Sequence, residues 1–254
     1  MRAIVLLSAG LDKVSGRPAP VGGEIRAIGM GLTVADGLAG VHVGPVTAPG
    51  IREYGGYGLD RIVTLQAGDA DPVDTVAAYI RSGTAFADGP VDLVLTARRA
   101  SGAEDSGLFP YALAHALGWP VVADVIGIDA PRDTQDPDLL EVEQALPRGV
   151  RRQVRVQRPC VLSVHDMAPT VPPFAFARMR AATVCAQAVD VSAMPRADTA
   201  DMNVQSRPYR ARPRLIQAQA ATAGGQVMVD PSPQDAAQAI VDHLVMLGVL
   251  SVNR

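Results

Sequence analysis

Apolar stretches of strand length alternate with helix-like stretches over the first 120 residues. The strands that this pattern predicts lie at residues 3–7, 39–43, 61–65 and 91–96. The helices that it predicts lie at residues 24–35, 51–57, 71–80 and 107–118. The strands at 3–7 and 91–96 are nearly continuous apolar runs, which is typical of a sheet buried on both faces. Strands that alternate with helices indicate an α/β fold with a parallel sheet and right-handed crossovers.

The pattern changes after Pro120. Strands are predicted at residues 121–128 and 161–164, with a β-hairpin between them at 139–145 and 150–157 around the turn Pro147-Arg148-Gly149. Residues 168–180 contain three prolines and fit no regular element, and residues 190–222 are too long and irregular for a compact loop. A final amphipathic helix is predicted at 232–247 with Ser232 as its N-cap.

These segments predict two parts. Residues 1–189 form a nucleotide-binding α/β domain, and residues 190–254 form an extended arm and helix that pack on another subunit. The length of the arm carries this expectation, because a long segment without its own core gains stability only by lying against another surface.

Composition excludes several classes of protein. The chain has 254 residues, 48% apolar residues and a net charge of −3, which favours a globular protein over one that binds nucleic acid electrostatically. No apolar run reaches the roughly 20 residues of a membrane helix, and we interpret MRAIVLLSAGL as the first strand rather than a signal peptide. The two cysteines, Cys160 and Cys185, have no metal-ligand spacing, so we expect a reduced cytoplasmic protein.

No catalytic motif is present in the sequence. It contains no HExxH, CxxC, GxGxxG or P-loop pattern, and no elbow motif marks a nucleophile. Its four histidines stand alone, and a lone histidine is more often a satisfied core or surface residue than a catalyst. A nucleotide-type fold without catalytic residues or a metal site favours a carrier or a binding subunit.

The turn at residues 98–107 is the best candidate site. It follows the strand at 91–96 and precedes a helix, so free N–H groups and the positive end of the helix dipole would meet there. Arg98 and Arg99 can hold a phosphate, Asp105 or Ser106 can cap the helix, and Gly107 lets a ligand approach the backbone. A solvated loop with an ordinary N-cap explains the same residues, and spacing alone does not separate the two.

The order of several motifs resembles the beta subunit of electron transfer flavoproteins. They are DLVLTARRAS…DSG…ALAHALGWP, the hairpin LLEVEQALPRGVRRQVRVQRPCVLSV, the segment APTVPPFAFARMR, and VHVGP with REYGGYGLDRIVTL near the second and third strands. The resemblance covers residues 1–184 well and the remainder loosely. It implies a Rossmann-like sheet of the adenine nucleotide alpha hydrolase type, with the hairpin as an appendage and an extended C-terminal arm.

The resemblance also implies cofactors and partners. Family members pair with an alpha subunit that carries most of the FAD site, and they accept electrons from a flavin dehydrogenase. The beta subunit usually buries AMP, which a second FAD replaces in electron-bifurcating members. Neither a nucleic acid nor a membrane span is implied.

Residue by residue, the resemblance assigns one set to the nucleotide and one to partner docking. The residues on its adenine side are Leu6, Val43 and Gly44. Those that begin the nucleotide loop are Thr96, Arg98, Arg99 and Ala100, and those that face the phosphate are Asp105, Ser106 and Gly107. The segment that docks the dehydrogenase contains Ala168, Pro169 and Met179, with Phe174 or Phe176 as its apolar anchor.

The chain departs from the family pattern at several places. The loop SGAEDSG is about two residues short of the family's usual form, Lys13 stands where an aromatic residue commonly touches FAD, and a lysine-rich run after the docking segment is absent. Shortened members of this kind resemble those paired with dehydrogenases that demethylate N-methyl amines such as dimethylglycine. The alternative class is a free-standing nucleotide-binding regulator similar to universal stress proteins. It would need neither the arm nor the Pro-Phe segment.

Overall fold

The computed structural model describes residues 1–12, 14–100, 106–129, 136, 138–192 and 228–250. The chain divides into two compact units, Met1–Ala197 and Asp198–Arg254. The first unit holds the sheet and the candidate site, and the second holds one described helix.

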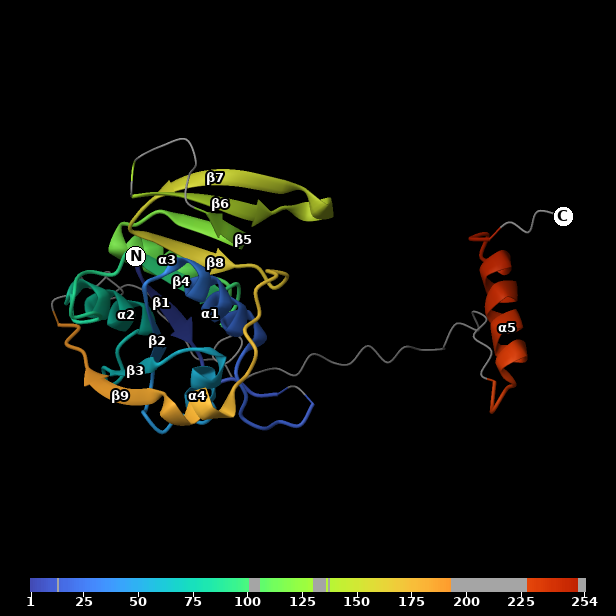
Figure 1. Cartoon of the computed structure of the whole chain (residues 1–254), viewed down its shortest axis with the longest axis horizontal. Helices are drawn as coiled ribbons and strands as arrows, with labels where there is room; N and C mark the ends of the chain where they lie inside the picture. The colour runs from blue at the N-terminus through green and yellow to red at the C-terminus, as the bar shows by residue number, and fades with distance from the viewer. Residues whose placement is uncertain (13, 101–105, 130–135, 137, 193–227, 251–254) are drawn as a thin grey trace, which may run out of the picture. The chain divides into compact units, whose positions relative to one another are not determined.

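Nine strands of the described residues form one sheet, in the order β7-β6-β5-β8-β4-β1-β2-β3-β9 (Figure 1). In chain order they are β1 (Arg2–Leu7), β2 (Gly37–Val43), β3 (Arg61–Gln66), β4 (Leu93–Ala97), β5 (Val121–Asp129), β6 (Leu139–Ala145), β7 (Arg151–Gln157), β8 (Cys160–Val164) and β9 (Thr183–Ala188). Neighbouring strands are parallel except for the β5–β6 and β6–β7 pairs. The parallel α/β sheet and its hairpin, predicted from the sequence, are confirmed.

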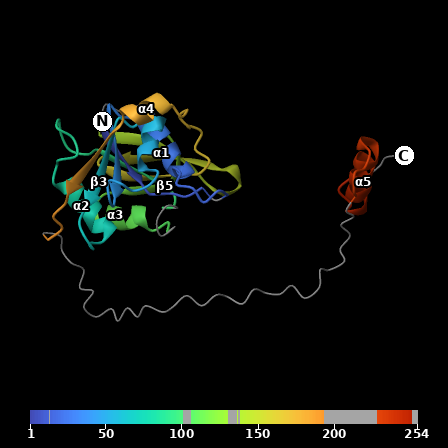
Figure 2. The same ribbon diagram turned by 90° about the horizontal axis from the view of Figure 1, so that it is seen from below.

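Helices cover both faces of this sheet. They are α1 (Gly22–Val34), α2 (Pro72–Arg81), α3 (Phe109–Leu117) and α4 (Phe176–Ala181), with the 3₁₀ helix η1 (Ile51–Tyr57). A second 3₁₀ helix, η2 (Pro147–Gly149), forms the turn between β6 and β7. Figure 2 shows α1 and α4 on one face and α2 and α3 on the other. In β1, Ala3 and Val5 pack into the core on the α1 face, while Ile4 packs into the core under α2 and α3. Two-sided burial is the physical reason that β1 is a continuous apolar run.

The segment between β8 and β9 crosses one face of the sheet. It begins near the centre, because β8 pairs with β4 and β5, and it ends at the edge, where β9 pairs with β3. It passes close over α1. A Cβ atom added at Gly29 would lie only 2.6 Å from the carbonyl oxygen of Thr170. Glycine at position 29 therefore allows this crossover to lie directly on the helix.

Two features of this crossover differ from the sequence expectations. Residues 168–180 were expected to be irregular, and that is wrong for their second half, because α4 occupies Phe176–Ala181. The prolines end at Pro173, and the following FARMRA contains no residue that breaks a helix. The edge strand β9 was not predicted, since its sequence TVCAQA lacks a strong apolar alternation.

The second unit contains α5 (Pro233–Met246). The side chain of Ser232 accepts a hydrogen bond from the backbone N–H of Asp235, so the predicted N-cap is confirmed. No described residue of α5 is buried, and Ile240 and Leu247 are each more than half exposed. Most of the predicted arm, residues 193–227, lies outside the described residues.

Candidate functional site

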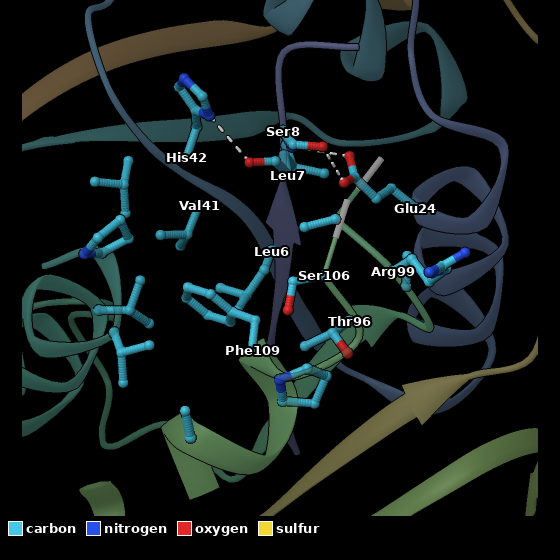
Figure 3. A pocket seen from close by; sticks show the side chains of 18 of the residues that line it. Leu6, Leu7, Ser8, Glu24, Val41, His42, Thr96, Arg99, Ser106 and Phe109 are labelled. Atoms are coloured by element: carbon cyan, nitrogen blue, oxygen red, sulfur yellow. Dashed lines mark hydrogen bonds between the residues drawn. The ribbon is translucent and has the colours of Figure 1, made fainter. Parts of the chain in front are cut away.

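A cavity of about 470 Å³ opens at the carboxyl ends of β1, β2 and β4 (Figure 3). From β1 the chain moves to β2 and β3 on one side, and it then returns to place β4 on the other side. This reversal leaves a crevice outside the strand ends, where α/β proteins bind their ligands. The cavity volume falls within the roughly 300–1,000 Å³ of small-molecule sites.

The walls of the cavity combine apolar side chains with a few polar groups. The apolar lining comes from β1, β2, α2 and α3, and includes Leu6, Val41, Val43, Val73, Val76 and Phe109. The polar lining includes Ser8, Glu24, His42, Thr96, Arg99 and Ser106. An apolar cleft with a few convergent polar groups is the usual form of a nucleotide or cofactor site.

The first turns of α2 and α3 both border the cavity. The carboxylate of Asp71 accepts a hydrogen bond of 2.7 Å from Val73 N and so caps α2. At the N-terminus of α3, the N-cap residue is Leu108, and no side chain caps the helix. The expectation that Ser106 is the N-cap is therefore wrong. Ser106 Oγ instead accepts a hydrogen bond of 3.0 Å from Leu108 N, one residue before the helix. The positive end of α3 thus faces the cavity beside a hydroxyl group.

Six of the residues assigned to the nucleotide by the family resemblance line this cavity. They are Leu6, Val43, Thr96, Arg99, Ala100 and Ser106. Thr96 is almost fully buried, and its hydroxyl makes no hydrogen bond to any residue that the structure describes. A buried polar atom without a protein partner is an open position for a polar group of a ligand.

Three other assigned residues lie outside the cavity. Arg98 Nε forms an ion pair of 3.1 Å with Asp124, and Arg98 and Gly107 line a second, polar hollow with Ser163. Gly44 directly follows β2, where its N–H donates to the carbonyl of Leu65 and its φ of 149° suits glycine. Asp105 and Lys13 lie outside the described residues.

Glu24 was not anticipated from the sequence as a site residue. It sits in the first turn of α1, is 3% exposed, and turns its carboxyl group toward the end of β1 (Figure 3). Ser8 donates to this carboxyl from its N–H over 2.9 Å and from its hydroxyl over 2.5 Å, and the hydroxyl of Tyr54 contacts the same group. Burial raises the pKa of Glu24 to about 7, although the hydrogen bonds from Ser8 and Tyr54 oppose the rise.

His42 also borders the cavity. It is buried, and its Nδ1 lies 3.0 Å from the carbonyl oxygen of Leu7. Burial lowers the pKa of His42, so the ring is neutral near pH 7. Because a carbonyl oxygen can only accept, Nδ1 carries the proton and Nε2 is left as an acceptor. His42 is therefore part of the cavity wall and is held through Nδ1.

The segment expected to dock a dehydrogenase forms an apolar surface on another part of this unit. Phe174 is 48% exposed and Phe176 is 61% exposed. The Phe174 ring packs edge-on against Tyr57, with 5.2 Å between ring centroids. Its position also depends on Gly56, because a Cβ atom there would collide with the ring. The fold therefore holds this aromatic surface in place without burying it.

The remaining docking residues differ in their exposure. Pro169 is exposed and Met179 is half-buried on α4. Ala168 is fully buried, and its carbonyl accepts a hydrogen bond from the guanidinium of Arg26. Ala168 thus fixes the start of the segment to α1.

A cavity with a helix N-terminus at the switch point of a parallel sheet is typical of nucleotide-binding α/β proteins. Residues 24–194 match the family model described as the electron transfer flavoprotein domain, and the chain belongs to this family. The electron transfer flavoprotein subunit beta of Chromohalobacter salexigens is 28% identical over 263 aligned positions, which cover 96% of this chain and 94% of that protein. The resemblance to beta subunits that was read from the sequence is confirmed.

The described residues include neither a membrane-spanning helix nor a metal-binding cluster. None of their helices has the length and apolar character to cross a membrane. No three His, Cys, Asp or Glu residues among them gather as a metal site would require. Cys160 and Cys185 are both free thiols.

Proposed function

We propose that this chain is the beta subunit of a heterodimeric electron transfer flavoprotein, which accepts electrons from a flavin dehydrogenase through FAD held mainly by an alpha subunit. The observation that carries the proposal is the family match over residues 24–194, in a chain that is similar to a beta subunit along 96% of its length. The chain would act as a cytoplasmic electron carrier without catalytic residues of its own. Its family membership favours this role over a free-standing nucleotide-binding regulator.

We propose an adenine nucleotide, AMP first, as the ligand of the cavity. Leu6 and Val43 offer apolar contacts for a base, and the Thr96 hydroxyl offers an open hydrogen-bonding position. Arg99 and Ser106 line the cavity that the N-terminus of α3 borders, so a phosphate there would gain from a positive charge and from the helix dipole. The residues present therefore fit a nucleotide.

FAD, when bound, supplies the electron-carrying chemistry of the complex. This chain would form one side of the cleft in which the flavin binds. The β1, β2 and β4 ends would help to orient the neighbouring subunit and would do no chemistry of their own.

We propose the surface around Phe174 and Phe176 as the contact for the electron-donating dehydrogenase. Both rings are exposed, and aromatic side chains held by their own protein are typical anchors of protein interfaces. Pro169 and Met179 would lie at the border of this contact, and buried Ala168 would hold its start. A donor of the dimethylglycine dehydrogenase type is the candidate that the shortened family pattern favours.

We propose that residues 190–254 pack on the alpha subunit. The described helix of this region, α5, leaves Ile240, Met246 and Leu247 more than half exposed. Apolar side chains on a capped amphipathic helix are stabilised when another surface covers them.

Co-expression of the full chain with an alpha-type subunit tests the proposal. The expected result is a yellow heterodimer that copurifies through one tagged subunit, and that releases FAD and AMP on denaturation. A colourless homodimer that binds ATP would instead assign the chain to the regulator class.

A further inference from the structure

A buried acid on the wall of the cavity is held by uncharged groups from two other parts of the fold. Ser8 follows β1, Glu24 begins α1 and Tyr54 lies in η1, and their polar atoms meet within hydrogen-bond distance. Among the described residues no cation forms an ion pair with Glu24. A buried carboxylate without a counter-charge is costly, and protonation removes that cost.

The hydrogen bonds around Glu24 suit both of its protonation states. The Tyr54 hydroxyl lies next to Glu24 Oε2 and 3.0 Å from the carbonyl oxygen of Ser8, and it accepts a hydrogen bond of 2.8 Å from Val21 N. When Glu24 is ionised, Tyr54 donates its proton to the carboxylate. When Glu24 is protonated, the carboxyl group donates to Tyr54, and Tyr54 donates to the Ser8 carbonyl. No heavy atom has to move between the two arrangements.

Other charged or titratable groups surround the same cavity. Those that line it are His42 of β2, Asp71 before α2 and Arg99 after β4. Asp166, which follows β8, lies close to α1, because its carboxylate is near Gly23. His42 is neutral and Asp71 is engaged in the α2 cap. Arg99 is therefore the cation that borders the cavity in the described part of the chain. It lies on the nucleotide loop rather than within the Ser8–Glu24–Tyr54 cluster.

We propose that Glu24 takes up one proton from solvent when the phosphate group of a nucleotide enters this cavity, so that nucleotide binding by this chain is linked to pH. The inference rests on the proposed nucleotide site. A phosphate in the cavity places a second negative charge near the carboxylate, and the ligand also displaces water from its wall. Both effects disfavour the ionised form of Glu24.

Glu24 ionises close to neutral pH, so a change in its ionisation on binding would make nucleotide affinity depend on pH in this range. Burial already raises the pKa of its carboxyl to about 7 in the ligand-free chain. A further rise on binding would convert a partly ionised group into a protonated one at neutral pH. An ordinary exposed carboxylate would remain ionised throughout and would take up no proton.

Calorimetric titration of the full chain with AMP and with adenosine, from about pH 6 to about pH 9, tests the proposal. The variants are Glu24→Gln and the matched control Glu53→Gln, which makes the same change on η1 next to Tyr54. The AMP dissociation constant of the wild type and the control should rise by up to about tenfold per pH unit relative to Glu24→Gln. The phosphate's own ionisation near pH 6 is common to all variants and cancels in the comparison. Adenosine, which lacks the charge, should show a weaker dependence.

The outcomes separate the inference from the function on which it rests. AMP binding with the same pH dependence in wild type and Glu24→Gln would overturn the inference and leave the nucleotide site intact. No AMP binding by the wild type at any pH would overturn both. If Glu24→Gln does not fold, the infrared difference spectrum of the wild type decides, because AMP should increase the C=O band of a protonated carboxyl group. A spectrum without that increase would overturn the inference.

Discussion

Replacing Glu24 by glutamine should reduce the pH dependence of the free energy of unfolding. The carboxyl group of an exposed glutamate titrates at pH 4.5, and burial raises the pKa of Glu24 to about 7 in the folded chain. The folded state therefore binds the proton more tightly. The stability that Glu24 contributes is fully present below the unfolded pKa and is lost as the pH rises through the folded pKa. At about 1.36 kcal/mol per pKa unit, the shift corresponds to about 3 kcal/mol.

Glutamine preserves the shape of the site and removes the ionisation. Its amide oxygen can accept from Ser8 N and Tyr54, as Glu24 Oε2 does in the native chain. Urea unfolding of both proteins between about pH 5 and about pH 8, followed by circular dichroism, gives the two free energies of unfolding. Their difference, glutamine variant minus wild type, should increase by about 2.5 kcal/mol over this range, because the rest of the shift falls below pH 5. Other titrating groups are common to both proteins and cancel.

The reasoning would be refuted by a difference that stays constant or decreases as the pH rises. Either result would mean that the folded chain does not favour the protonated form of Glu24. Glu53→Gln serves as the control, and its difference from the wild type should stay constant over the same range.

Three further predictions concern the cavity and the docking surface. Phe174→Ala with Phe176→Ala should slow flavin reduction by the donor dehydrogenase in stopped-flow measurements and leave the flavin content unchanged; loss of flavin would make the segment structural. Arg99→Ala with Ser106→Ala should lower AMP affinity by at least about tenfold, since hydrogen bonds to charged groups contribute about 1.5–3 kcal/mol each, and unchanged calorimetric affinity would contradict the site. Asp71→Ala removes the cap of α2 and should cost about 1 kcal/mol in urea unfolding, so an unshifted midpoint would argue against a stabilising cap.

Arg98→Ala is the matched control for the double change in the nucleotide loop. Arg98 precedes Arg99 in the chain but pairs with Asp124 outside the cavity. Its loss should therefore affect AMP affinity much less than the loss of Arg99 and Ser106. An equal loss would mean that the loop binds phosphate through its overall shape or charge.

The sequence predicts the central fold well because the strands are buried on both faces. A strand such as β1, with Ile4 facing one core and Val5 the other, is apolar at each position and stands out from its surroundings. The turn at Pro147–Gly149 and the cap at Ser232 are predictable because they depend on the types of a few neighbouring residues. β9 was missed because an edge strand with mixed exposure lacks this contrast.

The site was predicted only in part because two of its features depend on tertiary contacts. The sequence places Arg98 and Arg99 side by side, but it does not show that Arg98 pairs with Asp124 while Arg99 lines the cavity. Glu24 reads as an ordinary acidic residue in the first turn of a helix. In the fold, Glu24 is buried against Ser8 and Tyr54, which are distant from it in the sequence. No local sequence pattern predicts these contacts.

Under the proposed function, the crossover between β8 and β9 connects the donor contact to the central sheet. It spans four strands, β4, β1, β2 and β3, and is anchored at the middle of the sheet and at its rim. A donor protein that binds Phe174 would therefore contact a segment anchored to the same sheet whose strand ends form the cavity. Under the proposed function, any motion that brings two flavins closer together would then be expected in the alpha subunit.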